Sequence, residues 1–295
     1  MVARGAVRVS VPATSANLGP GFDSLGLALS LRDELEGELT GSGVTVEVTG
    51  EGAGTVPLDE SHLVVRSMMA AFEAMDVPEP GIRLRCRNVI PHARGLGSSS
   101  AAIVGGLVLA RALADREWSD DALLDVAVRL EGHPDNVAPA LTGGFTISGT
   151  DEHGVVFAVG SPVDPRIVAD VFVPPAGVST ELARGLLPAT VPHADAAADA
   201  GAAALLVAAL AGRPDQLWRA TRDFLHQDYR RGAMPGSLTL VEELRGQGIA
   251  AVVSGAGPTV LALVAHDQDL ADRCPGGWSH HRLAVDTRGA TASSV

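Results

Sequence analysis

The sequence predicts an α+β protein organised in two domains. Segments with the period-two alternation of strands occur beside segments with helical spacing, and the two kinds do not follow the regular order of a parallel βαβ sheet. The chain has 295 residues, 46% of them hydrophobic, which is enough for one large or two ordinary cores. The pattern of elements restarts near residue 160, so we expect domains at 1–160 and 161–295.

The first half of the chain is expected to hold a meander of strands and then mainly helices. A strand is predicted at AVRVSVPA, followed by a turn-rich loop at TSANLGPGFD. Residues 98–114 are apolar almost all round, which indicates a buried helix, and Ser119 is expected to cap an amphipathic helix at 119–131. Further strands are expected at 25–36, 44–48, 82–90 and GGFTISG, and further helices at 62–75 and after HPDN.

The second half is expected to add a smaller mixed domain. A buried strand is predicted at IVADVFVP, and two strands joined by a glycine-rich turn at AAVVSGAGPTVLALV. Helices are predicted at 180–187, 196–211, 214–226 and 237–246.

Charge and cysteine content narrow the class of protein. The net charge of −13, from 35 acidic and 22 basic residues, would repel nucleic acids and anionic lipid surfaces. Cys86 and Cys274 form no metal-binding pair, which fits a reducing compartment. The most apolar run, near 203–211, is too short to span a bilayer. We therefore expect a soluble cytoplasmic protein with no nucleic-acid or membrane partner.

A glycine- and serine-rich loop precedes the buried helix, in PHARGLGSSSAAIVGG at 91–106. Backbone amides at a helix N-terminus lack internal partners, and small residues such as Gly95 and Gly97 let a phosphate approach them. A helix start with glycines for close packing explains the segment equally well. A Walker A loop is excluded because the chain has no lysine, and a Rossmann loop is disfavoured because Ser100 stands at the third glycine position.

Two further segments are ordinary in isolation. In PATSANLGPGFDSLG, Asn17 and Asp23 flank a Gly-Pro-Gly turn and are themselves common turn formers. In SGAGPTVLAL, at 254–263, a glycine-rich turn joins two apolar stretches and reads as a tight hairpin.

Taken together and in this order, these segments resemble the three signature motifs of the GHMP kinases, which phosphorylate small molecules. The segments PATSANLGPGFDSLG, RGLGSSSA, EGHPDNVAPAL and STELAR are most similar to the homoserine kinase family. The resemblance implies an N-terminal domain of the ribosomal S5 domain 2-like type, a ferredoxin-like C-terminal domain, and ATP with Mg²⁺ bound between them. It also implies a homodimer that phosphorylates the side-chain hydroxyl of L-homoserine in threonine biosynthesis.

The resemblance assigns roles to particular residues. The phosphates of ATP would be bound by Pro91, Arg94, Gly95, Leu96, Gly97, Ser98, Ser99, Ser100 and Ala101. Magnesium would be held by Ser98 and Glu131, although a carboxylate at a helix end is often simply solvated. The amino acid would be bound by Asn17, Asp23, Asn136, Arg184 and Arg230, the two arginines clamping its carboxylate.

Catalysis is expected from positioning and charge stabilisation, because the resemblance is to a type without an aspartate base. Asn17, Thr180 and Arg184 are expected as catalytic residues near the transferred group. From the residues alone, Asp135 or Asn136 could instead cap a helix, and Arg184 could be a surface arginine.

Several positions depart from the family pattern. His62 replaces an asparagine near the expected adenine site, and Asp199 and Ala202 replace asparagine and arginine. His280 and His281 have no evident partner and are expected at the surface. Two other functions stay open: a GHMP-type kinase for another small alcohol, such as a sugar or a mevalonate-like acceptor, and a noncatalytic nucleotide-binding module of the same fold.

Overall fold

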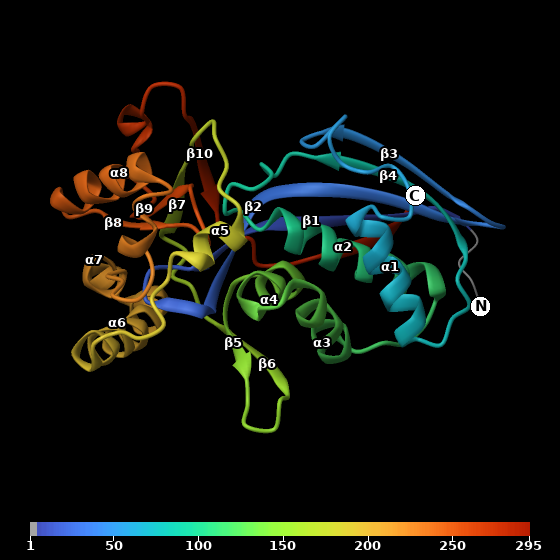
Figure 1. Ribbon diagram of the computed structural model, residues 1–295, viewed down its shortest axis with the longest axis horizontal. Helices are drawn as coiled ribbons and strands as arrows, with labels where there is room; N and C mark the ends of the chain where they lie inside the picture. The colour runs from blue at the N-terminus through green and yellow to red at the C-terminus, as the bar shows by residue number, and fades with distance from the viewer. Residues whose placement is uncertain (1–4) are drawn as a thin grey trace.

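The computed structural model describes residues 5–295 and contains two β-sheets with helices packed on them (Figure 1). The first sheet has the strand order β11-β1-β2-β4-β3, and a β5–β6 hairpin is joined to β2 through β5. Every pair is antiparallel except β3 with β4. The strands are β1 (Val7–Asn17), β2 (Gly21–Thr40), β3 (Val44–Gly50), β4 (Gly81–Asn88), β5 (Phe145–Thr150), β6 (Val156–Ser161) and β11 (Thr291–Ser294).

Four helices belong to this first part of the molecule. They are α1 (Leu63–Ala74), α2 (Ser98–Ala114), α3 (Asp120–Glu131) and α4 (Pro134–Thr142). The helix α2 lies against β1 and α1, and it is buried along most of its length, as its all-round apolar sequence predicts. A side chain at Gly106 would place its Cβ 2.6 Å from the Val64 carbonyl oxygen, so this glycine allows close packing of α2 on α1.

The second sheet is fully antiparallel, with the order β10-β7-β9-β8. Its strands are β7 (Ile167–Val173), β8 (Ala250–Val253), β9 (Val260–Ala265) and β10 (Ser279–Ala284). The helices of this part are α5 (Thr180–Gly185), α6 (His193–Gly212), α7 (Leu217–Ala220) and α8 (Pro235–Gly246), with short 3₁₀ turns η1 (Pro214–Gln216), η2 (Asp228–Arg230) and η3 (Ala271–Arg273). Alternate residues of β7 face different cores: Val171 joins the main core, whereas Phe172 packs with α8.

The predicted α+β class is confirmed, and most predicted elements are present within a few residues of their expected bounds. The first loop is shorter than predicted, because β1 continues to Asn17 and pairs with β2, leaving the turn at 18–20. The helix predicted at 214–226 ends at Ala220, since Asp223 accepts hydrogen bonds from the amides of Leu225, His226 and Gln227 and so favours an irregular loop. The strands β6, β10 and β11 were not predicted.

The domain boundary near residue 160 remains a prediction. The first four residues of the predicted N-terminal domain lie outside the described part of the chain. The strands change sheet between Ser161 and Ile167, close to the predicted position. The last strand, β11, pairs with β1, so the chain end returns to the first sheet although the prediction placed it in the second domain.

The helix α6 is longer than the apolar run at 203–211. By length and composition it is the one helix among the described residues that could cross a membrane. Leu206, Ala209 and Leu210 nevertheless lie in the hydrophobic core, and the buried carboxylate of Asp199 accepts a hydrogen bond from the Phe224 amide. These residues attach one side of α6 to the rest of the fold.

Candidate active site

A cavity of about 320 Å³ lies between the two parts of the molecule and brings the sequence motifs together. Its walls come from the end of β1, the start of β2, the loop before α2, the end of α3, and the starts of α4 and α5. The site residues of the prediction that line it are Asn17, Asp23, Gly95, Gly97, Ser98, Ser99, Glu131, Asn136, Thr180, Arg184 and Arg230.

Asn17 connects the first motif to the third. Its backbone has a positive φ of 67°, which is uncommon for residues other than glycine, and the residue lines the cavity. The Asn17 Oδ1 atom accepts from the Asp23 amide at 3.0 Å, and Nδ2 donates to the Gly255 carbonyl oxygen at 2.9 Å. Both ends of the amide group are therefore used to hold the site together.

Asp23 and Arg184 form a bidentate ion pair at the cavity wall. The two guanidinium nitrogens of Arg184 lie 2.9 Å and 2.5 Å from the carboxylate oxygens of Asp23. The hydrogen bonds from Arg184 to Asp23 raise the pKa of the arginine, which is charged in any case. About a third of each side chain is exposed, so the pair remains open to a ligand.

Arg230, the last residue of η2, lines the same cavity and is almost completely buried. Its Nε donates to the Ala183 carbonyl at 3.3 Å and its Nη1 to the Gly255 carbonyl at 3.0 Å. Burial lowers the pKa of Arg230 to about 10, and the nearby charge of Arg184 adds to the effect. The group stays protonated at neutral pH, so the cavity holds two cations, both near the ring of Phe22.

The loop before α2 is shaped by two glycines, and a side chain at either position would be strained. Gly95 and Gly97 have φ of +77° and +69°, and a Cβ on them would lie 2.2 Å from the Ser254 carbonyl oxygen and 2.0 Å from Thr14 Oγ1. Gly97 is the N-cap of α2 and offers no side-chain cap. The first amides of α2 therefore face the cavity without a side-chain partner at the cap, as an anion site requires.

Glu131 ends α3 and faces the start of α2. Its Oε1 accepts from Ser99 Oγ at 2.7 Å and from Ser100 Oγ at 2.8 Å, whereas Ser98 makes no hydrogen bond to it. No hydrogen bond among the described residues engages Oε2. A free carboxylate oxygen and the Ser98 hydroxyl on one wall form a donor set that suits Mg²⁺, which prefers a few hard oxygen ligands.

Asn136 and Thr180 line the cavity from two different helices, α4 and α5. Asn136 Oδ1 accepts from Thr14 Oγ1 at 2.8 Å, and Thr180 is the first residue of α5 after its N-cap, Ser179. His133 also lines the cavity and bonds to Asp135 at 2.5 Å. Burial lowers the pKa of His133, but the hydrogen bond and charge of Asp135 outweigh it and the net shift is upward.

Other residues of the predicted phosphate loop have different positions. The guanidinium of Arg94 donates to the carbonyls of His92, Pro174 and Pro175, so its side chain fastens the loop to the second part and is not available to phosphate. Leu96 points into the hydrophobic core. The remaining residues of that prediction, Pro91, Ser100 and Ala101, do not line this cavity.

A second cavity, of about 290 Å³, meets the first at Ser98 and Ser99. Its lining is mainly apolar and includes Val56, Pro57 and Leu63. His62 lines it and also caps α1 by accepting from the Val64 amide at 3.3 Å. Of the residues that the sequence associates with the nucleotide, Ser98, Ser99, Ala101 and His62 line this cavity. Sequence reasoning missed the rest of the lining, because it comes from short, unremarkable stretches around 56–64 and 88–92.

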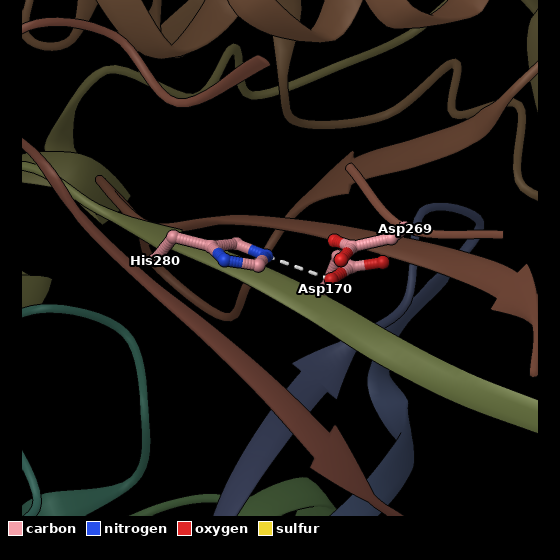
Figure 2. A group of neighbouring side chains, drawn as sticks. All are labelled: Asp170, Asp269 and His280. Atoms are coloured by element: carbon pink, nitrogen blue, oxygen red, sulfur yellow. Dashed lines mark hydrogen bonds and ion pairs between the residues drawn. The ribbon is translucent and has the colours of Figure 1, made fainter. Parts of the chain in front are cut away.

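The predicted surface position of His280 is wrong. His280 Nε2 donates to the buried Asp170 at 2.7 Å, as Figure 2 shows, and its ring lies 5.1 Å from that of Phe172. Asp269 approaches the same point, but Arg282 Nη1 also donates to Asp170 at 2.9 Å. The guanidinium already neutralises the Asp170 carboxylate, so we assign this cluster a structural role.

Comparison with known proteins agrees with this geometry. Residues 62–144 match the GHMP kinases N terminal domain, and residues 203–275 match the GHMP kinases C terminal model. Curated homoserine kinases of Streptomyces coelicolor and Streptomyces avermitilis are 54% and 55% identical over 293 residues, covering 97% of this chain and 94% and 95% of theirs.

Solved structures extend the likeness to three dimensions. The crystal structure of homoserine kinase from Cytophaga hutchinsonii has a TM-score of 0.87 at 28% identity, with 99% of each chain covered. A crystal structure of mevalonate kinase, at 12% identity and a TM-score of 0.70 over 95% of this chain and 99% of its own, shares the fold alone. The chain therefore belongs to the GHMP kinases and, within them, to the homoserine kinase family.

Proposed function

We propose that the protein transfers the γ-phosphoryl group of ATP to the side-chain hydroxyl of L-homoserine, giving O-phospho-L-homoserine and ADP, a step of threonine biosynthesis. The observation that carries this proposal is the charge pattern of the first cavity. Two guanidinium groups, from Arg184 and Arg230, line it beside the uncapped start of α2. Of the three carboxylates in the lining, Asp23 forms an ion pair with Arg184.

An amino acid has charges that complement this pattern. Its ammonium group would bind the Asp23 carboxylate and the amide oxygen of Asn136, while its carboxylate would bind Arg184 and Arg230. Asp23 and Arg184 neutralise each other through two hydrogen bonds, and a zwitterion replaces both halves of that pair at once. A sugar or an unsubstituted alcohol offers no such exchange.

The nucleotide would extend from the second cavity to the loop before α2. The apolar lining of the second cavity suits a purine base, and Ser98 and Ser99 connect it to the acceptor cavity. The backbone of the 95–99 segment would bind the phosphates, which explains how a chain without lysine can serve a kinase. Ser98 and Glu131 would hold magnesium, which, when bound, neutralises phosphate oxygens and keeps them in place.

The hydroxyl proton would leave without a dedicated aspartate base. Each carboxylate that lines the acceptor cavity already has a partner: Asp23 binds Arg184, Glu131 binds two serine hydroxyls, and Asp135 binds His133. We propose that the proton passes to the phosphate itself. Phosphoryl transfer tolerates this, because its transition state is loose and most of the acceleration comes from orientation and charge neutralisation.

Three residues would stabilise the transferred group. Thr180 would supply its hydroxyl from the start of α5, and Arg184 its guanidinium from the same helix. Asn17 would act through Asp23, whose amide it binds and whose carboxylate binds Arg184. Their contributions would be electrostatic and positional.

An assay with acceptor fragments tests the function. ADP release should be fast with L-homoserine and at least about 100-fold lower in kcat/KM with 3-aminopropan-1-ol, which lacks the carboxylate, and with 4-hydroxybutanoate, which lacks the ammonium group. Equal rates with all three would favour a kinase for another small alcohol, and no turnover by folded protein would favour a noncatalytic module.

We further propose that the protein acts in the cytoplasm as a homodimer. Its two cysteines are both free, which suits a reducing compartment, and ATP and amino acids are cytoplasmic metabolites. Sedimentation equilibrium tests the assembly state, and a mass of one chain at micromolar concentration would contradict the dimer.

A further inference from the structure

We propose that His226 is a positioning residue that acts as a neutral hydrogen-bond acceptor for Arg230 and locks it to the Gly-Pro-Gly turn at 19–21. Arg230 is one of the two arginines expected to bind the substrate carboxylate, so the kinetic part of this inference rests on the proposed function. Its structural part does not.

His226 lies in the irregular loop between α7 and η2 and has 1% of its surface exposed. Its Nε2 is 2.8 Å from the Gly19 carbonyl oxygen, and its Nδ1 is 3.1 Å from Arg230 Nη1. The ring packs on Phe22 with 5.3 Å between centroids. The imidazole thus connects the turn after β1, the start of β2 and the arginine.

These partners fix the tautomer. Arginine has only donors, so Nδ1 must accept from Arg230 and cannot carry a proton. The Gly19 carbonyl has only acceptor capacity, so Nε2 must carry the proton and donate to it. Neutral histidine with the proton on Nε2 satisfies both contacts at once.

The consequence for Arg230 is a fixed orientation. Three acceptors hold it: the Ala183 carbonyl on Nε, and the Gly255 carbonyl and His226 on Nη1. Within residues 5–295, no hydrogen bond engages Nη2. This end of the guanidinium is left for a ligand in the cavity that Arg230 lines.

The surroundings keep His226 neutral. Burial lowers the pKa of the imidazole, and the charge of Arg230 lowers it further, against opposing effects from Asp223 and Asp23. Arg184 is the other cation near Phe22, with its Cζ 5.5 Å from the ring centroid, and Asp199 of α6 lies close enough to Asp223 to feel its charge. A proton on Nδ1 would remove the acceptor and place two like charges 3.1 Å apart, so protonation would displace Arg230.

Kinetics of variants tests the positioning role. His226→Asn has an amide too short to reach both partners, and its KM for L-homoserine should rise about 10-fold or more while its KM for ATP stays within about 2-fold. His226→Gln can donate to Gly19 and accept from Arg230, and should stay within about 3-fold of the wild type. Protonation of His226 should lower kcat/KM for L-homoserine as the pH falls. His226→Gln should lack this fall, because glutamine does not titrate, while falls caused by other groups remain.

His280 provides a matched control. It is also a largely buried histidine, its ring lies 5.1 Å from that of Phe172, and it bonds to a buried partner far from the cavity. His280→Asn should lower stability without a selective rise in the KM for L-homoserine. A merely structural role for His226 predicts the same behaviour in both asparagine variants, and that result would overturn the proposal.

A substrate-free measurement keeps the inference separate from the proposed function. In ¹⁵N-histidine spectra of the wild type at neutral pH, His226 should carry its proton on Nε2 with a free Nδ1. A proton on Nδ1, or a charged ring, would contradict the proposal whatever the enzyme phosphorylates. Absence of homoserine turnover in the wild type would contradict the proposed function and leave this measurement as the test of the tautomer.

Discussion

Arg184 and Arg230 are two arginines in one cavity with different environments. Arg184 is about a third exposed and paired with Asp23, whereas Arg230 is buried and bonded to carbonyls and to His226. Arg184 can therefore exchange Asp23 for a ligand, while Arg230 is held in one orientation with its Nη2 left for a ligand. The sequence segment STELAR indicated the first arginine, but nothing local in HQDYR indicated that the second would be buried.

Reversing the charge of Arg184 should act mainly on the amino-acid substrate. In Arg184→Glu the clamp becomes repulsive toward the substrate carboxylate and toward Asp23, so we expect the KM for L-homoserine to rise about 100-fold or more. Steady-state kinetics with each substrate varied measures this. Arg231→Glu, on a surface arginine paired with Glu242, is the control, and an unchanged KM in Arg184→Glu would favour another acceptor.

Asp199 should make stability depend on pH. Burial raises its pKa from 3.8 to about 6, and the nearby charge of Asp223 adds to the shift. The folded state then holds this proton more tightly than the unfolded state, so the free energy of unfolding falls as pH rises from about 4 through about 6.

Asp199→Asn should remove this pH-dependent loss of stability, because asparagine carries no charge. Its side-chain oxygen can still accept the hydrogen bond from the Phe224 amide. We expect the variant to be about 1–3 kcal/mol more stable than the wild type at pH 8 and nearly equal at pH 4. Urea unfolding at several pH values measures the difference, and Asp267→Asn, at an exposed position, is the control. Equal stabilities at pH 8 would show that Asp199 is not destabilised by its burial.

At the scale of elements, the site depends on how α2 begins. The apolar character of residues 98–114 on almost all sides predicted α2 with its observed bounds, because such a helix is stable in water only when it is buried. The same pattern could not show that Gly95 packs against Ser254 or that Gly97 packs against Thr14, contacts between residues far apart in sequence. Local patterns likewise missed the end of α7. The Asp223 carboxylate accepts hydrogen bonds from the amides of Leu225 and Gln227, and the chain forms a loop there in place of a longer helix.

Gly97→Ala should disrupt the N-terminus of α2. A Cβ would clash with Thr14 Oγ1 at 2.0 Å, on a backbone whose φ of +69° disfavours alanine. We expect nucleotide affinity to fall about 10-fold or more and stability to fall by about 1–3 kcal/mol. Calorimetric titration with a nonhydrolysable ATP analogue measures the affinity.

Gly201→Ala is the matched control in α6, where a Cβ would meet nothing within 4 Å. It should leave affinity unchanged and add about 0.5–1 kcal/mol of stability. Wild-type affinity in Gly97→Ala would contradict the role of the uncapped helix start.

At the scale of the molecule, the candidate active site is also the junction of the two parts. The Gly255 amide donates to the Ala16 carbonyl, the Thr259 amide to the Arg94 carbonyl, and Ser254 Oγ to the Gly95 carbonyl. The main hydrophobic core also runs from α2 into β7 and α6. The motifs predicted which residues meet, but the return of β11 to the first sheet had no signal, since its four residues are exposed and follow no pattern.

Because these contacts link the two sheets, we expect them to unfold together. Hydrogen exchange of amides in β1 and β9 should report the same global free energy of unfolding, and ligands should raise both equally. Two separate values, with only one raised by nucleotide, would show that the parts are independent.

The most direct test of the account is the identity of the product. An equimolar mixture of L-homoserine, mevalonate and galactose, supplied with Mg-ATP and followed by ³¹P NMR, offers the three kinds of alcohol at once. The charge pattern of Asp23, Arg184 and Arg230 predicts O-phospho-L-homoserine as the main phosphorylated product. Phosphorylation of mevalonate or galactose in preference, by folded enzyme, would contradict it.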